Sequence, residues 1–140
     1  MAALVQVHAN NILDASLGNS GVAQGFTATT FPLKCRLMTS TTSSPTVAGT
    51  ELGTGGGYVA GTGISGVSFA AAATGTKATN ADVTQTNMPA VGSPGIQAIE
   101  LWDSTATPVR KWYGLLTLAK TTNAGDTFTI TTGSLTAVLS

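Results

Sequence analysis

Short runs in which apolar and polar residues alternate recur from residue 31 to the end of the chain, separated by turns rich in Gly, Pro and Thr. The clearest run spans residues 31–38, and its apolar face consists of Phe31, Leu33, Cys35 and Leu37. A period of two residues is typical of a strand with one buried face. The intervening Lys34 and Arg36 are expected to face solvent. This pattern constrains the chain to a mainly β fold.

Further strand candidates follow at short intervals. They are residues 58–59, 64–72, 83–88, 96–102 and 108–120, followed by a hairpin in which 126–130 turns at 132–134 into 135–139. A Thr/Ser-rich loop is predicted over 39–50, and Pro89 with Gly92–Gly95 predicts a turn before residue 96. Seven or eight such strands favour an antiparallel β-sandwich, Ig-like or jelly-roll-like, with a small barrel as the alternative.

The start of the chain shows helical spacing instead. Apolar and neutral residues recur through Ala15, and Gly18–Asn19 ends the pattern, which predicts a short helix over residues 7–17. The 140 residues fit one domain, with an N-terminal helix or arm over 1–18 and a β-sandwich over 26–140. We expect no signal peptide, because the first residues have neither a basic region nor a long apolar one. We expect no membrane span, because no stretch approaches about 18 consecutive apolar residues.

The chain is poor in charge. Asp, Glu, Lys and Arg make up 9% of its residues, and six acidic and six basic side chains cancel to a net charge of +0. Soluble proteins carry about 25% charged residues, and near-zero net charge favours association. We therefore expect a protein that packs against neighbours. Arg110–Lys111 is the one basic cluster beside aromatic residues, too small a patch to predict a nucleic-acid partner.

Groups for enzyme chemistry are scarce. The single histidine, His8, and the single cysteine, Cys35, fall in different predicted elements, so no nucleophile–base pair or His/Cys metal site is expected. Glu100 and Asp103 could supply the paired carboxylates of a glycosidase, but their odd spacing places them on opposite faces of a strand. Residues 53–58 lack the Gly-Lys-Ser/Thr ending of a phosphate loop. We expect no catalytic activity, metal or cofactor.

Four aromatic residues are candidates for contact with a glycan if they are exposed, and they are Tyr58, Trp102, Trp112 and Tyr113. A packed core position is the alternative for each of them. Because neighbouring residues of a strand face opposite ways, Trp112 and Tyr113 are expected on different faces of their sheet.

The chain carries a series of short motifs, in the order Asn11–Asp14, Leu37–Thr39, Gly49–Leu52, Gly55–Tyr58, Glu100–Asp103, Tyr113–Leu116 and Ala124–Thr127. In this order they resemble small virion proteins of tailed bacteriophages, a group labelled capsid-decoration, minor tail and tail-fibre proteins. The resemblance implies a β-sandwich that is present in many copies on a particle, with no catalytic residues to carry over.

Composition and resemblance together lead us to expect a structural component of a bacteriophage virion, made in the cytoplasm of the host bacterium. The first expectation is a capsid decoration protein that binds and stabilises the head surface. The alternative is a tail-associated or fibre protein with a carbohydrate- or receptor-binding role. Expected partners are the major capsid protein or tail proteins, and further copies of the chain, with a trimer as the expected oligomer. The interface candidates at the N-terminus are Leu4, Val7, Ile12 and Leu13.

Overall fold

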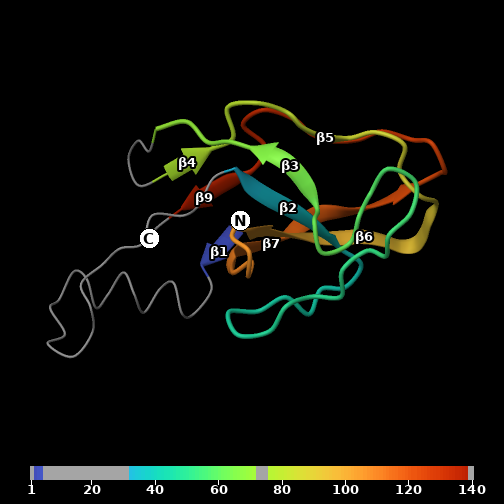
Figure 1. Cartoon of the computed structure of the whole chain (residues 1–140), viewed down its shortest axis with the longest axis horizontal. Coiled ribbons are helices and arrows are strands. Elements are labelled where there is room, and N and C mark those ends of the chain that lie inside the picture. Colours follow the sequence, from blue (N-terminus) through green and yellow to red (C-terminus); the bar gives the residue numbers. More distant parts are fainter. Residues whose placement is uncertain (1, 5–31, 72–75, 139–140) are drawn as a thin grey trace, which may run out of the picture.

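The computed structural model describes residues 2–4, 32–71 and 76–138, and strands dominate these residues (Figure 1). The strands are β1 (Ala2–Leu4), β2 (Leu33–Met38), β3 (Ile64–Val67), β4 (Thr76–Ala78), β5 (Val83–Gln85), β6 (Val91–Trp102), β7 (Arg110–Thr122), β8 (Phe128–Ile130) and β9 (Thr136–Val138). No helix occurs in the described ranges, so none there could cross a membrane. Their strand pairs are antiparallel except for β1 with β9. The prediction of a mainly β, antiparallel fold is confirmed.

The strands form two sheets that share one core. The larger sheet has seven strands in the order β3-β2-β6-β7-β1-β9-β4, and the smaller sheet pairs β5 with β8. Side chains of both sheets are buried together, and the core consists of Leu33, Cys35, Leu37, Leu52, Tyr58, Ile64, Val67, Val83, Met88, Val91, Ile96, Ile99, Leu101, Phe128 and Leu135. Burial of this apolar surface is the main term that favours the folded state.

The alternation that predicted β2 is confirmed over residues 33–37. Phe31, the first residue of the predicted apolar face, lies outside the described residues, and Lys34 and Arg36 are less exposed to solvent than predicted. Leu33, Cys35 and Leu37 are buried, whereas Lys34 and Arg36 on the other face are half-buried. The strand lies between β3 and β6, so both of its backbone edges are paired. Strands predicted over 64–72, 83–88 and 108–120 occur as β3, β5 and β7 with different ends.

The turn predicted before residue 96 is wrong, because residues 92–95 lie inside β6. Val91 pairs with Thr122 and Ile96 with Lys120, so five residue steps along β6 match two steps along β7. The Gly- and Pro-rich sequence therefore forms a bulge rather than a chain reversal, which is a common use of such residues in long strands. Next to this bulge, the extra residues lie in β7 instead. Ile96 pairs with Lys120 and Ala98 pairs with Leu115, so two residue steps along β6 match five steps along β7. Residues 116–119 of β7 consequently have no register partner in β6.

The predicted C-terminal hairpin is also wrong, although its turn at residues 131–134 is present. β8 pairs with β5 in the smaller sheet, and β9 pairs with β4 and β1 in the larger one. The turn itself is bound to a distant segment, since Gly133 N donates to Thr79 O (2.9 Å) and Thr132 N donates to Asp82 Oδ1 (2.7 Å). These hydrogen bonds, and the one from Thr79 N to Leu135 O (3.1 Å), take the place of a hairpin ladder.

The predicted N-terminal helix over residues 7–17 lies outside the described residues, as do the interface candidates Val7, Ile12 and Leu13. Leu4 is the last residue of β1, and its backbone pairs with Trp112 of β7. The backbone of residues 2–4 thus forms a strand between β7 and β9, where the sequence predicted an arm.

Cys35 is expected to be unreactive in the folded protein. It is fully buried in the core, and burial raises the pKa of its thiol to about 12 from an ordinary value of 9.0. Because the thiolate is the reactive species, iodoacetamide at pH 8 should leave the native thiol unmodified and alkylate it in urea, as measured by mass spectrometry. The stabilisation from keeping this thiol neutral is present below about pH 9 and is lost as the pH rises towards 12. Equal alkylation rates with and without urea would contradict the burial.

Candidate functional site

A buried ion pair joins β6 and β7 on the face of the larger sheet that points away from the core. Glu100 has no exposed surface and Arg110 is 9% exposed, and Arg110 Nη1 lies 2.8 Å from Glu100 Oε1. The register of the two strands explains the contact, because Arg110 pairs with Trp102, two residues beyond Glu100 on the same face. A charge this deeply buried needs a partner and hydrogen bonds.

Both carboxylate oxygens of Glu100 are fully engaged. Oε1 accepts hydrogen bonds from Ser43 Oγ (2.9 Å), Gly49 N (2.8 Å) and Arg110, and Oε2 accepts one from Trp102 Nε1 (3.1 Å). A general acid or base must exchange a proton with a substrate at its carboxyl group. The contacts of Glu100 instead bind the predicted loop over residues 39–50 to the sheet.

Arg110 also binds this loop, because its guanidinium donates hydrogen bonds to two backbone carbonyl groups of the loop. Nη1 donates to Val47 O (2.6 Å), and Nη2 donates to Ser44 O (2.7 Å). The guanidinium also lies 5.7 Å from the centre of the Tyr113 ring. Arg110 is therefore occupied within the fold, and it adds no free cation to the basic cluster seen in the sequence.

Asp103, the other carboxylate considered for a glycosidase pair, is held by its own set of partners. Burial raises the pKa of its carboxyl group, but hydrogen bonds from Val109 N (2.9 Å) and Thr105 Oγ1 (2.8 Å) and the ammonium of Lys111 (3.3 Å) lower it, and the net shift is downward. Such a group is ionised and bound at neutral pH. Glu100 and Asp103 thus hold two separate structural clusters rather than one acid–base site.

A second polar cluster joins β2 to the glycine-rich loop over residues 53–63. The Arg36 guanidinium lies over the Trp102 ring at 4.0 Å from its centre, and Arg36 Nη1 lies 3.5 Å from Glu51 Oε2. Glu51 Oε1 accepts hydrogen bonds from Tyr58 Oη (2.8 Å) and Gly61 N (2.9 Å). This arrangement combines a cation–π contact with a bound carboxylate, and it fixes the loop against the strand.

Tyr58 lies at the centre of this loop, where the sequence predicted the start of a strand. The residue forms an isolated bridge with Gly55 instead, and its side chain is fully buried. Leu37 N donates to the phenol oxygen (3.1 Å), and burial raises the pKa of the phenol well above its usual range. A sugar would need an exposed ring face, so this burial removes Tyr58 from the glycan candidates.

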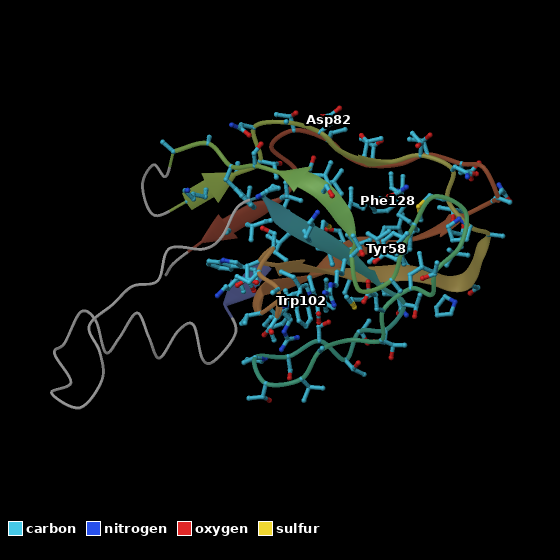
Figure 2. All side chains as sticks on the ribbon, viewed as in Figure 1. Tyr58, Asp82, Trp102 and Phe128 are labelled. Carbon is cyan, nitrogen blue, oxygen red and sulfur yellow. The ribbon has the colours of Figure 1, made fainter. Side chains whose placement is uncertain are left out.

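The three other aromatic candidates are half-buried and do not form one platform. Trp102 lies below β2 and β6 in Figure 2, covered by Arg36, whereas the core residue Phe128 lies above them. Trp112 packs against the core. Tyr113 pairs with Glu100 and therefore shares the face of Trp102.

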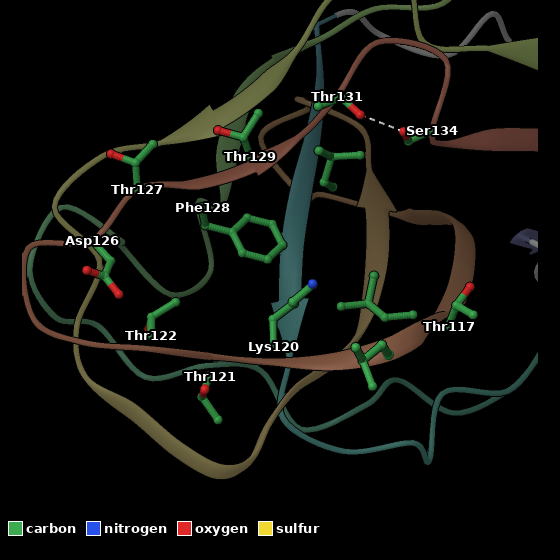
Figure 3. A pocket seen from close by; sticks show the side chains of 13 residues that line it. Thr117, Lys120, Thr121, Thr122, Asp126, Thr127, Phe128, Thr129, Thr131 and Ser134 are labelled. Atoms are coloured by element: carbon green, nitrogen blue, oxygen red, sulfur yellow. Dashed lines mark hydrogen bonds between the residues drawn. The ribbon is translucent and has the colours of Figure 1, made fainter.

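A groove of about 590 Å³ opens between the second half of β7 and β8 (Figure 3). Its lining consists of Leu116, Thr117, Leu118, Lys120, Thr121, Thr122, Asp126, Thr127, Phe128, Thr129, Ile130, Thr131 and Ser134. Figure 3 shows Phe128 and Lys120 pointing into the space enclosed by the two strands and their connection. The lining has one cation, one anion, seven hydroxyl groups and four apolar side chains. It suits an uncharged, extended ligand better than an ionic one.

The groove exists because the smaller sheet does not reach across the larger one. β8 has β5 as its neighbour on one side and no strand on the other among the described residues. Leu118 of β7 is consequently 70% exposed, although it belongs to the apolar run over residues 112–118. The sequence did not predict this groove, because a Leu in a strand can be exposed or buried and the residue type does not distinguish the two.

Sequence reasoning also missed the ion pair of Glu100, and here a signal was present. The residues around it, Ile96–Trp102, are apolar at both odd and even positions, a pattern of a strand covered on both faces. A carboxylate within such a strand requires a buried partner.

Within the described residues, no three or more His, Cys, Asp or Glu side chains are grouped so that they could hold a metal ion. Comparison of the chain with protein-family models, curated proteins and solved structures found no match. The function of the chain must therefore be inferred from its residues and their contacts.

Proposed function

We propose that the chain is a structural component of a bacteriophage virion, and that it decorates the capsid by binding the head surface in many copies. The observation that carries this proposal is that the described acidic side chains are all hydrogen-bonded within the chain. Every acidic side chain in the described ranges accepts hydrogen bonds from the chain itself, and these residues are Glu51, Asp82, Glu100, Asp103 and Asp126. The surface therefore offers hydroxyl and apolar groups to a partner, with few free charges.

Such a surface suits permanent packing against other proteins. Interface cores are depleted in Lys, Glu and Asp, and copies with a net charge of +0 repel one another weakly. Large apolar side chains are exposed as well, and among the described residues they are Val47, Val59, Val109, Leu115 and Leu118. The resemblance of its short motifs, in their order along the chain, to small virion proteins of tailed bacteriophages also supports this proposal.

We further propose that the two sheets constitute an antiparallel β-sandwich of the Ig-like or jelly-roll-like kind. The support is the single core to which both sheets contribute, with Val83 and Phe128 from the smaller sheet beside Cys35 and Leu37 from the larger one. Sandwiches of this kind bury alternate residues of each inner face, as β2 does.

Immunogold electron microscopy of native phage particles tests the proposed location. Antibody raised against the chain should label heads at many positions, and the same antibody absorbed with purified protein is the control. Label on tails or fibres alone would contradict decoration and favour the tail-associated alternative. Absence of label from all particles would contradict the virion role itself.

A decorating protein should also stabilise the shell by mass action, because it binds the assembled state. Particles that lack the chain should release their DNA at a lower temperature than complete particles, and added purified protein should restore the difference. Equal release temperatures would argue against a stabilising role.

One observation favours carbohydrate binding by a tail-associated or fibre protein as the second candidate. Tyr113 lies on the face of the larger sheet that points away from the core and keeps part of its surface exposed. This candidate predicts glycan-array binding that Tyr113→Ala abolishes without unfolding the protein, and a blank array would argue against it.

A further inference from the structure

Two loops of the chain are each held by one carboxylate. The loop over residues 39–50 donates hydrogen bonds to Glu100, and the glycine-rich loop over residues 53–63 donates hydrogen bonds to Glu51. Residues 51 and 52 alone separate the two loops along the chain. The loops are therefore neighbours in sequence that have separate anchors.

The backbone between the two loops is fixed to β2. Leu52 N donates a hydrogen bond to Leu37 O (2.8 Å), and Glu51 forms an isolated bridge with Met38, the last residue of that strand. Backbone that is bonded to a strand on both of these residues moves only with the strand. A displacement of one loop is therefore not passed to the other along the chain.

Side chains connect the two anchors instead, and Trp102 lies at the centre of the connection (Figure 2). Trp102 Nε1 donates a hydrogen bond to Glu100 Oε2 (3.1 Å), and the Arg36 guanidinium lies over the indole ring at 4.0 Å from its centre. Arg36 Nη1 in turn lies 3.5 Å from Glu51 Oε2. The two carboxylates that hold the loops are thus joined through one tryptophan and one arginine.

The position of Arg36 depends on this ring. Its side chain is 13% exposed, and its Nε is a buried nitrogen that has no hydrogen-bond partner in the described part of the chain. A buried guanidinium in this state is stabilised by the face of an aromatic ring and by a nearby carboxylate. A shift of Trp102 therefore changes the position of Arg36, and through it the contact with Glu51.

We propose that Trp102 couples the two loops, so that the loops over residues 39–50 and 53–63 detach from the sheet and reattach as one unit. Breaking the contacts of one loop with its carboxylate then weakens those of the other loop. A partner that contacts either loop consequently orders both. Each loop exposes one large apolar side chain, Val47 at 55% and Val59 at 50%, and the coupling fixes both positions together. This inference is independent of the virion role.

Hydrogen exchange of the full chain, followed by NMR, tests the coupling. The reporters are the amides of Gly49 and Gly61, each of which donates to one of the two carboxylates. Ser43→Ala removes one hydrogen bond to Glu100 and changes neither reporter. It should accelerate the exchange of both amides by at least about fivefold, because a hydrogen bond to a charged group is lost. Acceleration of Gly49 alone would overturn the proposal.

Trp102→Phe tests the route of the coupling, since it keeps an aromatic ring and removes the indole N–H. In this background, Ser43→Ala should accelerate the exchange of Gly49 as before and leave that of Gly61 unchanged. Equal acceleration of Gly61 with and without the indole would show that the loops are coupled by another route, against the proposal. Arg36→Gln interrupts the same route on its other side, and the same comparison in that background decides if Trp102→Phe does not fold.

Lys111→Met is the matched control, because it breaks an ion pair in a cluster whose side chains make no described contact with Trp102. Lys111 Nζ lies 3.3 Å from Asp103 Oδ2, and Asp103 Oδ1 accepts a hydrogen bond from Val109 N (2.9 Å). Exchange of the Val109 amide should accelerate in this variant, and exchange of the Gly61 amide should not. Acceleration of both would mean that any lost ion pair loosens the whole chain, and Trp102 would then have no special role.

Discussion

Replacement of Glu100 by Gln is expected to lower the free energy of unfolding by about 3–5 kcal/mol, the usual effect of leaving one member of a buried ion pair without its partner. The change keeps the shape of the side chain and removes its charge. Arg110, 9% exposed, then remains buried without a counter-charge. The amide also cannot accept every hydrogen bond that Ser43, Gly49, Trp102 and Arg110 now donate to the carboxylate. Urea denaturation followed by circular dichroism measures the difference.

The matched control is Asp126→Asn, the same chemical change at an exposed carboxylate. Asp126 accepts a hydrogen bond from Asn123 N (2.7 Å) in a surface turn, so its replacement should cost about 1 kcal/mol. A local measurement separates the cause from general destabilisation. The Gly49 amide is bound to Glu100 Oε1, and its hydrogen exchange should accelerate in Glu100→Gln more than that of core amides. Equal costs for the two variants would show that the ion pair is not buried as described.

A double variant, Glu100→Met with Arg110→Met, extends the argument. Buried ion pairs are often replaced by apolar residues at little cost, whereas removal of one partner is expensive. The double variant should therefore be more stable than the sum of the two single changes predicts. The recovery should stay incomplete, because Val47 O and Ser44 O lose the donors that Arg110 provides.

The location of strands could be predicted from the sequence because alternation is a local signal. Residues 33–38 carry a period of two with aliphatic side chains and Cys35 on one face, and β2 forms there with that face buried. The choice of partner strands is not local. β2 pairs with β6 through Arg36 and Glu100, and nothing near either residue indicates the other. The same limit made the C-terminal hairpin prediction fail, since Thr79 and Asp82 bind its turn from far away in the chain.

The candidate site was less accessible to prediction than the fold. The groove is open because no described strand covers Leu118. The sequence of β7 does not indicate this, since an apolar residue fits the strand pattern whether or not another strand covers it. The bulge at residues 92–95 has a related cause, because Gly and Pro fit both a turn and a bulge, and only the pairing with β7 decides between them. Tyr58 was considered for glycan contact because aromatic residues suit both surfaces and cores, and its hydrogen bonds to Glu51 and Leu37 hold it inside.

Replacement of Gly63 by Ala is the second change expected to have a large effect, lowering the free energy of unfolding by about 2–5 kcal/mol. Gly63 has a φ of +67°, a conformation that costs other residues about 1–2 kcal/mol. A Cβ atom there would also lie 2.6 Å from the carbonyl oxygen of Cys35, a backbone atom that cannot move aside without shifting β2. Such overpacking lowers the free energy of unfolding by about 1–3 kcal/mol more.

Gly61→Ala separates the two contributions, because Gly61 has a similar φ of +79° and no atom within 4 Å of the position that a Cβ would take. It should cost about 1–2 kcal/mol, the conformational part alone. The excess cost of Gly63→Ala, measured by urea denaturation of both variants, then reports the close approach of the loop to β2. Because Gly63 directly precedes Ile64, which pairs with Cys35, that excess also tests the pairing of β3 with β2. Equal costs for the two variants would mean that β3 does not begin against the Cys35 carbonyl, and the edge of the larger sheet would have a different register.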